Sequence, residues 1–186
     1  MNIDAKYDTL TIDLTRYTFV TSGGNTMSEI IKIQEQDDER KRLQDNLLLI
    51  RRAVGWTAEQ LGERIGVTRQ TINNIEAHRN KLSKTQYIAI RAVLDAEISK
   101  SPEDTEMLRC LLDVIIDNPN KYDKSEREEL LNKANMLTPS ILAGTTSRED
   151  VSKEFIKSAA KLGVIAIAAT AAGVGAWLLK ELNKES

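Results

Sequence analysis

The chain has 186 residues, of which 41% are hydrophobic, 29% are charged and only 4% are aromatic, and its formal net charge at pH 7 is −2. With 9 glycines and 3 prolines, this composition favours a helical fold, because sheet proteins use more aromatic residues and turn glycines. The single cysteine (Cys110) and single histidine (His78) exclude an intrachain disulfide and argue against a Cys/His metal site or Ser-His-Asp chemistry. We therefore expect no enzymatic activity, no metal and no cofactor.

The first 26 residues have two interpretations. The stretch TLTIDLTRYTFV alternates polar and apolar side chains, which predicts a β-strand that forms a short arm. Alternatively, residues 1–26 are an untranslated leader. Gly23-Gly24 is encoded by GGN-GGN, which with adenine at the third positions is a bacterial ribosome-binding site at a sensible distance from Met27, and Met27 would then be the natural start. The segment has neither the basic start nor the apolar core of a signal peptide.

Residues 27–100 are predicted to form a DNA-binding domain. Within it, residues 40–100 carry a net charge of +6, whereas residues 1–39 carry −5 and residues 101–186 carry −3. A basic block between acidic flanks favours a polyanion-binding module, although a plain solvated surface can have the same charge.

Two short capped helices are predicted between Trp56 and Asn80. Thr57 with Gln60 forms a capping box, and Gly66 ends the first helix as a residue free to adopt positive φ. Thr68 caps the second helix. Two short helices joined by a glycine turn make a helix-turn-helix, and Gly62 is the small residue that lets the helices approach closely.

The second helix has one apolar and one polar face. Ile72 and Ile75 are expected to be buried. The opposite face carries amides and an arginine, the side chains that read base edges in the major groove, instead of the Glu and Lys of an ordinary solvated face. That face consists of Arg69, Gln70, Asn73, Asn74 and Ala77.

The segment LLLIRRAVGWTAEQLGERIGVTRQTINNIE, with YIAIRAVL after it, resembles the Cro/Xre-type helix-turn-helix family of phage repressors. The resemblance covers residues 43–94 and implies an all-α, lambda-repressor-like domain of five short helices. Three positions depart from the family pattern. Ala58 replaces a phosphate-contacting glutamine, Ala77-His78 replaces Asn-Gly, and Leu82 replaces proline.

The resemblance also implies which residues contact DNA. The base-reading positions are Arg69, Gln70, Thr71 and Asn74. Phosphate contacts are expected from the cations and polar groups around them, with help from the free N–H groups of the helix N-terminus. These residues are Arg64, Thr68, Asn73, Arg79, Lys81 and Lys84.

A helical hairpin is predicted over residues 101–137. Its first helix has Ser101 as cap and Pro102 at the first helical position, and its second has Ser125 and Glu128 as a capping box. Each helix has an apolar face that could complete the core, or the two helices together could form the contact of a dimer that binds two half-sites about 34–36 Å apart. We favour the homodimer. Residues 138–147, TPSILAGTTS, are interpreted as a linker.

The last predicted helix, residues 148–183, begins after the cap Ser147 and contains eighteen uncharged residues at 162–179. At 1.5 Å per residue these span about 27 Å, just short of the roughly 30 Å hydrocarbon core of a membrane. Snorkelling of Lys161 and Lys180 extends the reach. We therefore predict a single membrane span, with the N-terminus inside. The alternatives are a buried alanine-rich helix of an oligomer and a reversible interfacial helix.

The leading hypothesis is a dimeric, repressor-like bacterial regulator of transcription that binds double-stranded DNA at the cytoplasmic face of the cell membrane. One alternative is a membrane-anchored interaction or scaffold protein whose helix-turn-helix binds protein. The other is a soluble antitoxin or phage-type repressor in the cytoplasm. No small-molecule ligand is expected.

Overall fold

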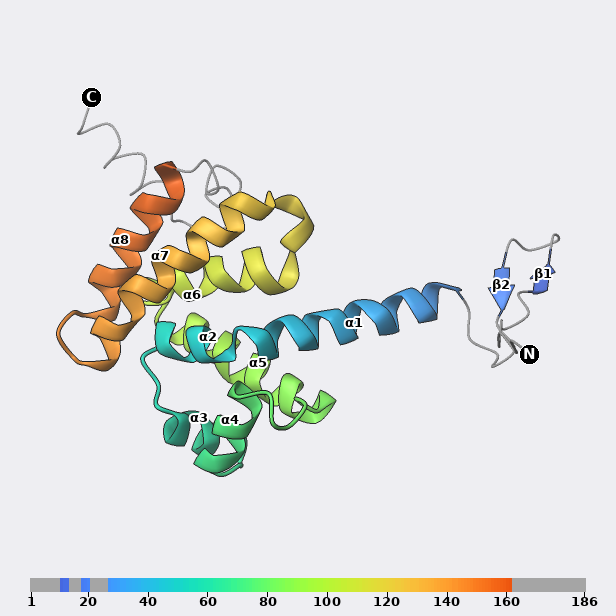
Figure 1. Cartoon of the computed structure of the whole chain (residues 1–186), viewed down its shortest axis with the longest axis horizontal. Coiled ribbons are helices and arrows are strands. Elements are labelled where there is room, and N and C mark those ends of the chain that lie inside the picture. Colours follow the sequence, from blue (N-terminus) through green and yellow to red (C-terminus); the bar gives the residue numbers. More distant parts are fainter. Residues whose placement is uncertain (1–10, 14–17, 21–26, 162–186) are drawn as a thin grey trace, which may run out of the picture. The chain divides into compact units, whose positions relative to one another are not determined.

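The computed structural model describes residues 11–13, 18–20 and 27–161 of the chain (Figure 1). Residues 1–40 and 41–186 form two compact parts. The first part contains two antiparallel strands, β1 (Thr11–Asp13) and β2 (Thr18–Val20), with Thr11 opposite Val20. The prediction of a single strand over TLTIDLTRYTFV is therefore wrong. Pairing of the two short strands satisfies backbone N–H and C=O groups that a lone strand leaves without partners.

Residues 27–161 are helical apart from short turns, which confirms the all-α prediction for this described segment. Helix α1 (Met27–Asp45) begins in the first part and ends in the second. The helices that follow are α2 (Leu47–Ala53), α3 (Ala58–Ile65), α4 (Arg69–Glu76), α5 (Lys84–Lys100), α6 (Glu106–Leu111), the π-helix η1 (Leu112–Asp117), the 3₁₀ helix η2 (Pro119–Lys121), α7 (Lys124–Leu142) and α8 (Arg148–Lys161).

Five helices lie between residues 27 and 100, as the family resemblance implies, but two of them are long. Helix α1 has 19 residues and α5 has 17. Helix α5 runs on because no glycine or proline interrupts the chain between its cap Ser83 and Pro102. The expectation of five short helices is therefore wrong for α1 and α5.

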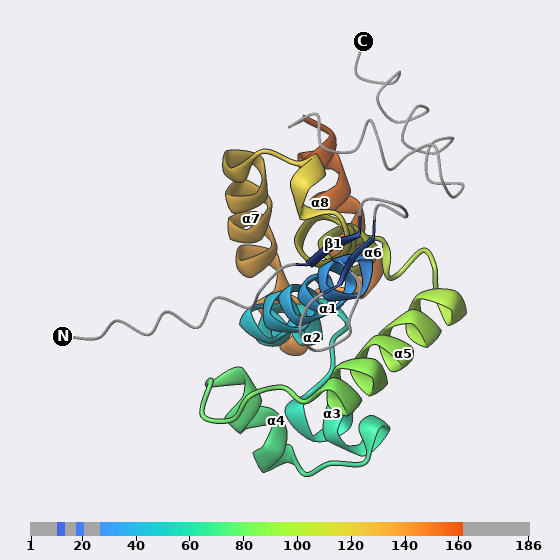
Figure 2. The ribbon, with the colours of Figure 1, turned by 90° about the vertical axis from the view of Figure 1, so that its right-hand side faces the viewer.

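Helix α2 lies at the centre of the second part. In both Figure 1 and Figure 2 the α3–α4 pair lies on one side of α2, and α6, α7 and α8 lie on the other. One continuous cluster of buried apolar side chains extends from Leu43 at the end of α1 to Ala159 on α8. The C-terminal helices thus complete the core of the helix-turn-helix region.

The apolar face of the first predicted hairpin helix is part of that core. All six of its side chains are buried: Met107, Leu108, Leu111, Leu112, Ile115 and Ile116. The face therefore takes the first of the two predicted roles, completion of the core, and the homodimer stays a prediction.

Two helix starts in the C-terminal region differ from the sequence-based expectation. Helix α6 begins at Glu106 instead of just after Ser101, because Thr105 Oγ1 donates to the Ser101 carbonyl at 2.7 Å and closes a turn over residues 102–105. The capping box of α7 consists of Asp123 and Glu126, not Ser125 and Glu128.

The predicted linker 138–147 is wrong over its first half, because α7 continues to Leu142. Thr138 is completely buried, and Ile141 packs against the core. Packing of Ile141 against the core outweighs the backbone hydrogen bond lost at Pro139, which lies inside the helix. Only residues 143–147 connect α7 to α8.

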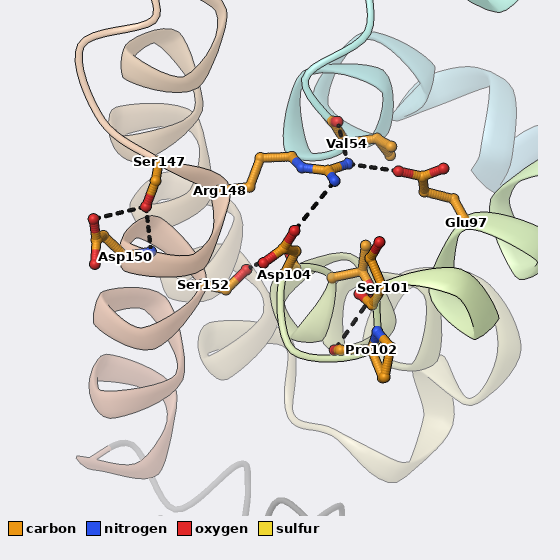
Figure 3. Close-up of polar contacts among 10 residues, drawn as sticks. Val54, Glu97, Ser101, Pro102, Asp104, Ser147, Arg148, Asp150 and Ser152 are labelled. Atoms are coloured by element: carbon orange, nitrogen blue, oxygen red, sulfur yellow. Dashed lines mark hydrogen bonds and ion pairs between the residues drawn. The ribbon is translucent and has the colours of Figure 1, made fainter.

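The start of α8 joins four segments of the chain (Figure 3). Ser147 caps the helix as predicted, since its Oγ accepts a hydrogen bond from the Asp150 N–H at 3.1 Å. The next residue, Arg148, donates to the Val54 carbonyl at 3.1 Å and to Glu97 at 2.7 Å. Its other terminal nitrogen lies 3.3 Å from Asp104 Oδ2. The guanidinium therefore connects α8 to the end of α2, to α5 and to the turn before α6.

In the described part of the chain, no helix is long and apolar enough to cross a membrane. The predicted span 162–179 lies outside the described residues.

Candidate nucleic-acid interface

The turn between α3 and α4 sets the angle between these helices. Gly66 ends α3 with φ of +75°, as predicted, and the Val67 N–H donates to the Gly62 carbonyl at 2.8 Å. A Cβ atom on Gly62 would lie 2.6 Å from the Val67 carbonyl oxygen. Only glycine fits at position 62, which confirms the prediction that a small residue permits the close approach of α4.

Helix α3 begins at the predicted capping box. Gln60 N–H donates to Thr57 Oγ1 at 3.1 Å, and the Thr57 N–H donates to Gln60 Oε1 at 2.8 Å. Ala58 is buried. Its methyl group cannot make the hydrogen bond to phosphate that the resemblance assigns to a glutamine at this position.

Helix α4 has the two faces that the sequence predicts. Ile72 and Ile75 are completely buried. Arg69 and Gln70 are exposed on the other side, and Asn74 is half-buried there. Gln70 Nε2 donates to Asn74 Oδ1 at 3.0 Å, one turn further along the helix. This bond joins the two amides along the exposed edge of α4.

Thr68 and Thr71 lie at the N-terminus of α4. The Thr71 N–H donates to Thr68 Oγ1 at 3.2 Å, and the two hydroxyl oxygens are 3.0 Å apart. The remaining free N–H groups of the first turn give this end a partial positive charge, which attracts a phosphate. Asn73, the predicted phosphate contact on the following turn, is half-buried.

The cations predicted to contact phosphates lie on α3, in the loop after α4 and at the start of α5. Arg64 on α3 stacks on Trp56, with its guanidinium carbon 4.1 Å from the ring centroid, and donates to the Gln60 carbonyl at 2.9 Å. Arg79 and Lys81 are exposed in the loop after α4, and Lys84 is exposed at the start of α5. Helices α3 and α4 and the start of α5 lie together at the end of the second part that is opposite α8 (Figures 1 and 2).

The loop after α4 has a backbone position with positive φ at one of the three departures from the family pattern. His78 has φ of +55°, the left-handed region that favours glycine, and the family has glycine at this position. His78 therefore adopts a backbone conformation that costs energy for a residue with a Cβ atom. Its Nδ1 lies 3.9 Å from Asp45 Oδ1 at the end of α1.

A buried ion pair that we did not predict as part of the site connects α2 to the end of α4. Arg51 Nε lies 2.6 Å from Glu76 Oε1, and Arg51 Nη2 donates to Glu76 Oε2 at 3.0 Å. Arg51 Nη1 also donates to the Trp56 carbonyl at 2.7 Å. The sequence could have indicated this pair, because Arg51 falls four residues after Leu47 on the buried face of α2. An arginine in such a position needs a partner, since an unpaired buried charge is costly.

Gln44 is a second residue that the sequence did not point to. It contacts the loop after α4 from the last turn of α1, across more than 30 residues of sequence. No regular pattern in the sequence marks such a contact. In the described segments, no cluster of three or more Cys, His, Asp or Glu residues could hold a metal ion.

Comparison with known families agrees with this geometry. Residues 47–100 match the helix-turn-helix family model. The match is to the Cro/Xre type and runs from the first residue of α2 to the last residue of α5. It indicates a DNA-binding regulator of transcription for this segment. No curated protein and no solved structure matches the chain.

Proposed function

We propose that the protein is a sequence-specific, repressor-like regulator of transcription that binds double-stranded DNA through α4. The observation that supports this most strongly is the division of α4 into a buried Ile72–Ile75 face and an outer edge that offers Arg69, Gln70 and Asn74. A helix of this kind fits the major groove, where side chains can reach base edges.

Each outer side chain has a role in this proposal. Arg69 donates to both O6 and N7 of a guanine, and the Gln70 and Asn74 amides pair with adenines. Thr71 makes a further contact to a base edge. The remaining contacts go to phosphates and fix the register of the protein on the duplex. They come from Arg64, Thr68, Asn73, Arg79, Lys81 and Lys84.

The proposal includes a homodimer, because two recognition helices about 34–36 Å apart read two half-sites one helical turn apart. It also includes a membrane tether through residues 162–179 at the cytoplasmic face, inferred from the length and composition of that segment. The C-terminal end of α8 lies on the opposite side of the second part from α4 (Figures 1 and 2). DNA on α4 and a membrane beyond Lys161 would therefore not compete for the same surface.

A gel-shift titration of the full-length chain against genomic fragments tests the proposal. The whole chain is needed because α8 completes the core, and a mild non-ionic detergent keeps the apolar tail in solution. We expect fragments to be shifted selectively and the affinity to fall steeply with salt, with a slope of about −0.9 for each phosphate contact. A chain that shifts no fragment at low salt contradicts DNA binding. Retention of the chain in carbonate-washed membranes tests the tether separately.

A further inference from the structure

The loop that follows α4, residues 77–82, carries two exposed cations on either side of Asn80. These are Arg79 and Lys81. The loop is partly fixed by its own backbone, since the Arg79 N–H donates to the Asn74 carbonyl at 2.9 Å. Backbone groups of Ile75, Asn80 and Leu82 also form hydrogen bonds with partner atoms outside the loop.

The side chain of Gln44 supplies those partners. Its Nε2 donates to the carbonyls of Ile75 at 3.1 Å and Asn80 at 2.8 Å. Its Oε1 accepts from the Leu82 N–H at 2.9 Å. One amide group therefore holds the last turn of α4, the middle of the loop and the end of the loop at the same time.

Gln44 is itself held in place. Its neighbour Leu43 is completely buried, and Leu47, one turn further on, is nearly so. Leu82, whose N–H it binds, is also buried. The loop is thus attached to a fixed point of the core, and its conformation depends on the position of Gln44.

We infer that Gln44 is a positioning residue for DNA binding, whose amide fixes the loop so that Arg79 and Lys81 face the DNA phosphates. The inference rests on the proposed function, and it extends the DNA-binding unit to the end of α1, which precedes the matched segment 47–100. Only an amide of this length meets the requirement. A glutamate cannot donate to two carbonyls, and a methionine can neither donate to them nor accept from the Leu82 N–H.

The test uses the full-length chain and a duplex of random sequence, because phosphate contacts act on any DNA. The wild type is titrated over a range of salt concentrations beside Gln44→Met, the double variant Arg79→Ala/Lys81→Ala, and the triple variant that combines all three substitutions. Gln36→Met is the matched control, since Gln36 is exposed on the same helix. Thermal melting by circular dichroism shows that each variant is folded.

We expect Gln44→Met to reduce the salt slope by up to about 1.8, which is about 0.9 for each of two phosphate contacts. At about 0.1 M salt this slope corresponds to about an eightfold loss of affinity per contact. The double alanine variant should lose a similar amount, and Gln44→Met should add nothing further in that background. Gln36→Met should bind as the wild type does.

The inference is overturned if Gln44→Met keeps the wild-type salt slope, or if its loss adds in full to that of the double alanine variant. A wild-type chain that does not bind the duplex at low salt overturns the proposed function instead. One measurement does not depend on any variant. Hydrogen exchange of the free wild-type protein should show a protected Leu82 amide, and an unprotected amide there overturns the inference.

Discussion

Replacement of Arg51 by methionine should destabilise the protein by about 3–5 kcal/mol, because it removes one partner from a buried ion pair. The side chains of Arg51 and Glu76 are only 8% and 9% exposed. Two parallel contacts of 2.6 and 3.0 Å join the guanidinium to the carboxylate. After the substitution, the Glu76 carboxylate stays buried without a counter-charge, and the Trp56 carbonyl loses its donor.

A second substitution separates this explanation from a simple loss of packing. In the Arg51→Met/Glu76→Met variant no charge is left unpaired, so the remaining cost is that of the Trp56 carbonyl without a donor, about 1–3 kcal/mol. The double variant should therefore be more stable than Arg51→Met alone by about 2 kcal/mol. Urea unfolding of the full-length chain, followed by the helical circular dichroism signal, measures both free energies of unfolding.

The control is Arg79→Met, which removes an exposed arginine and should change the free energy of unfolding by no more than about 0.5 kcal/mol. The reasoning is refuted if Arg51→Met is as mild as this control. It is also refuted if the double variant is less stable than each single variant, since the two charges would then not depend on each other.

Three further predictions follow from single residues. His78→Gly should stabilise the protein by about 1 kcal/mol in urea unfolding, because φ of +55° is unfavourable for a residue with a Cβ; a loss would mean that the Asp45 contact outweighs the strain. Arg148→Met should lower the free energy of unfolding by about 2–3 kcal/mol, since it removes charge-assisted hydrogen bonds to Val54, Glu97 and Asp104. It should also speed proteolysis in the 143–147 connection, and unchanged cleavage would contradict the role of Arg148 in holding the start of α8. Burial raises the pKa of Cys110 to about 12, so iodoacetamide should alkylate the folded chain far more slowly than the urea-unfolded chain, and equal rates would contradict this burial.

The parts of the fold that sequence predicted well depend on local chemistry. The capping box of α3, the glycine at the end of α3 and the two faces of α4 each involve residues three to seven positions apart. At that spacing the donor, the acceptor and the helical period can be read directly from the chain. The same holds for Gly62, because its requirement for a small side chain comes from the turn only five residues later.

The errors and omissions come from contacts between distant segments. TPSILAGTTS looked like a linker because it contains Pro139, Gly144 and several hydroxyl residues, but α7 continues through half of it, where Ile141 packs against the core. The partners of Gln44 and Arg148 lie between 31 and 94 residues away in the sequence. Side chains of this kind have no regular spacing to reveal them, so their roles appear only when the segments are packed together.

The central claim, sequence-specific reading of DNA by α4, is tested most directly by selection of binding sites from a random duplex pool. The wild type, Arg69→Ala and a control, Lys121→Ala, which removes an exposed cation from η2, are compared. We predict that the wild type and the control enrich the same motif. Arg69→Ala should lose its preference at one guanine position and bind the original motif about 1–3 kcal/mol more weakly. Enrichment of the same motif with the same affinity by Arg69→Ala, or of no motif by the wild type, would contradict the claim.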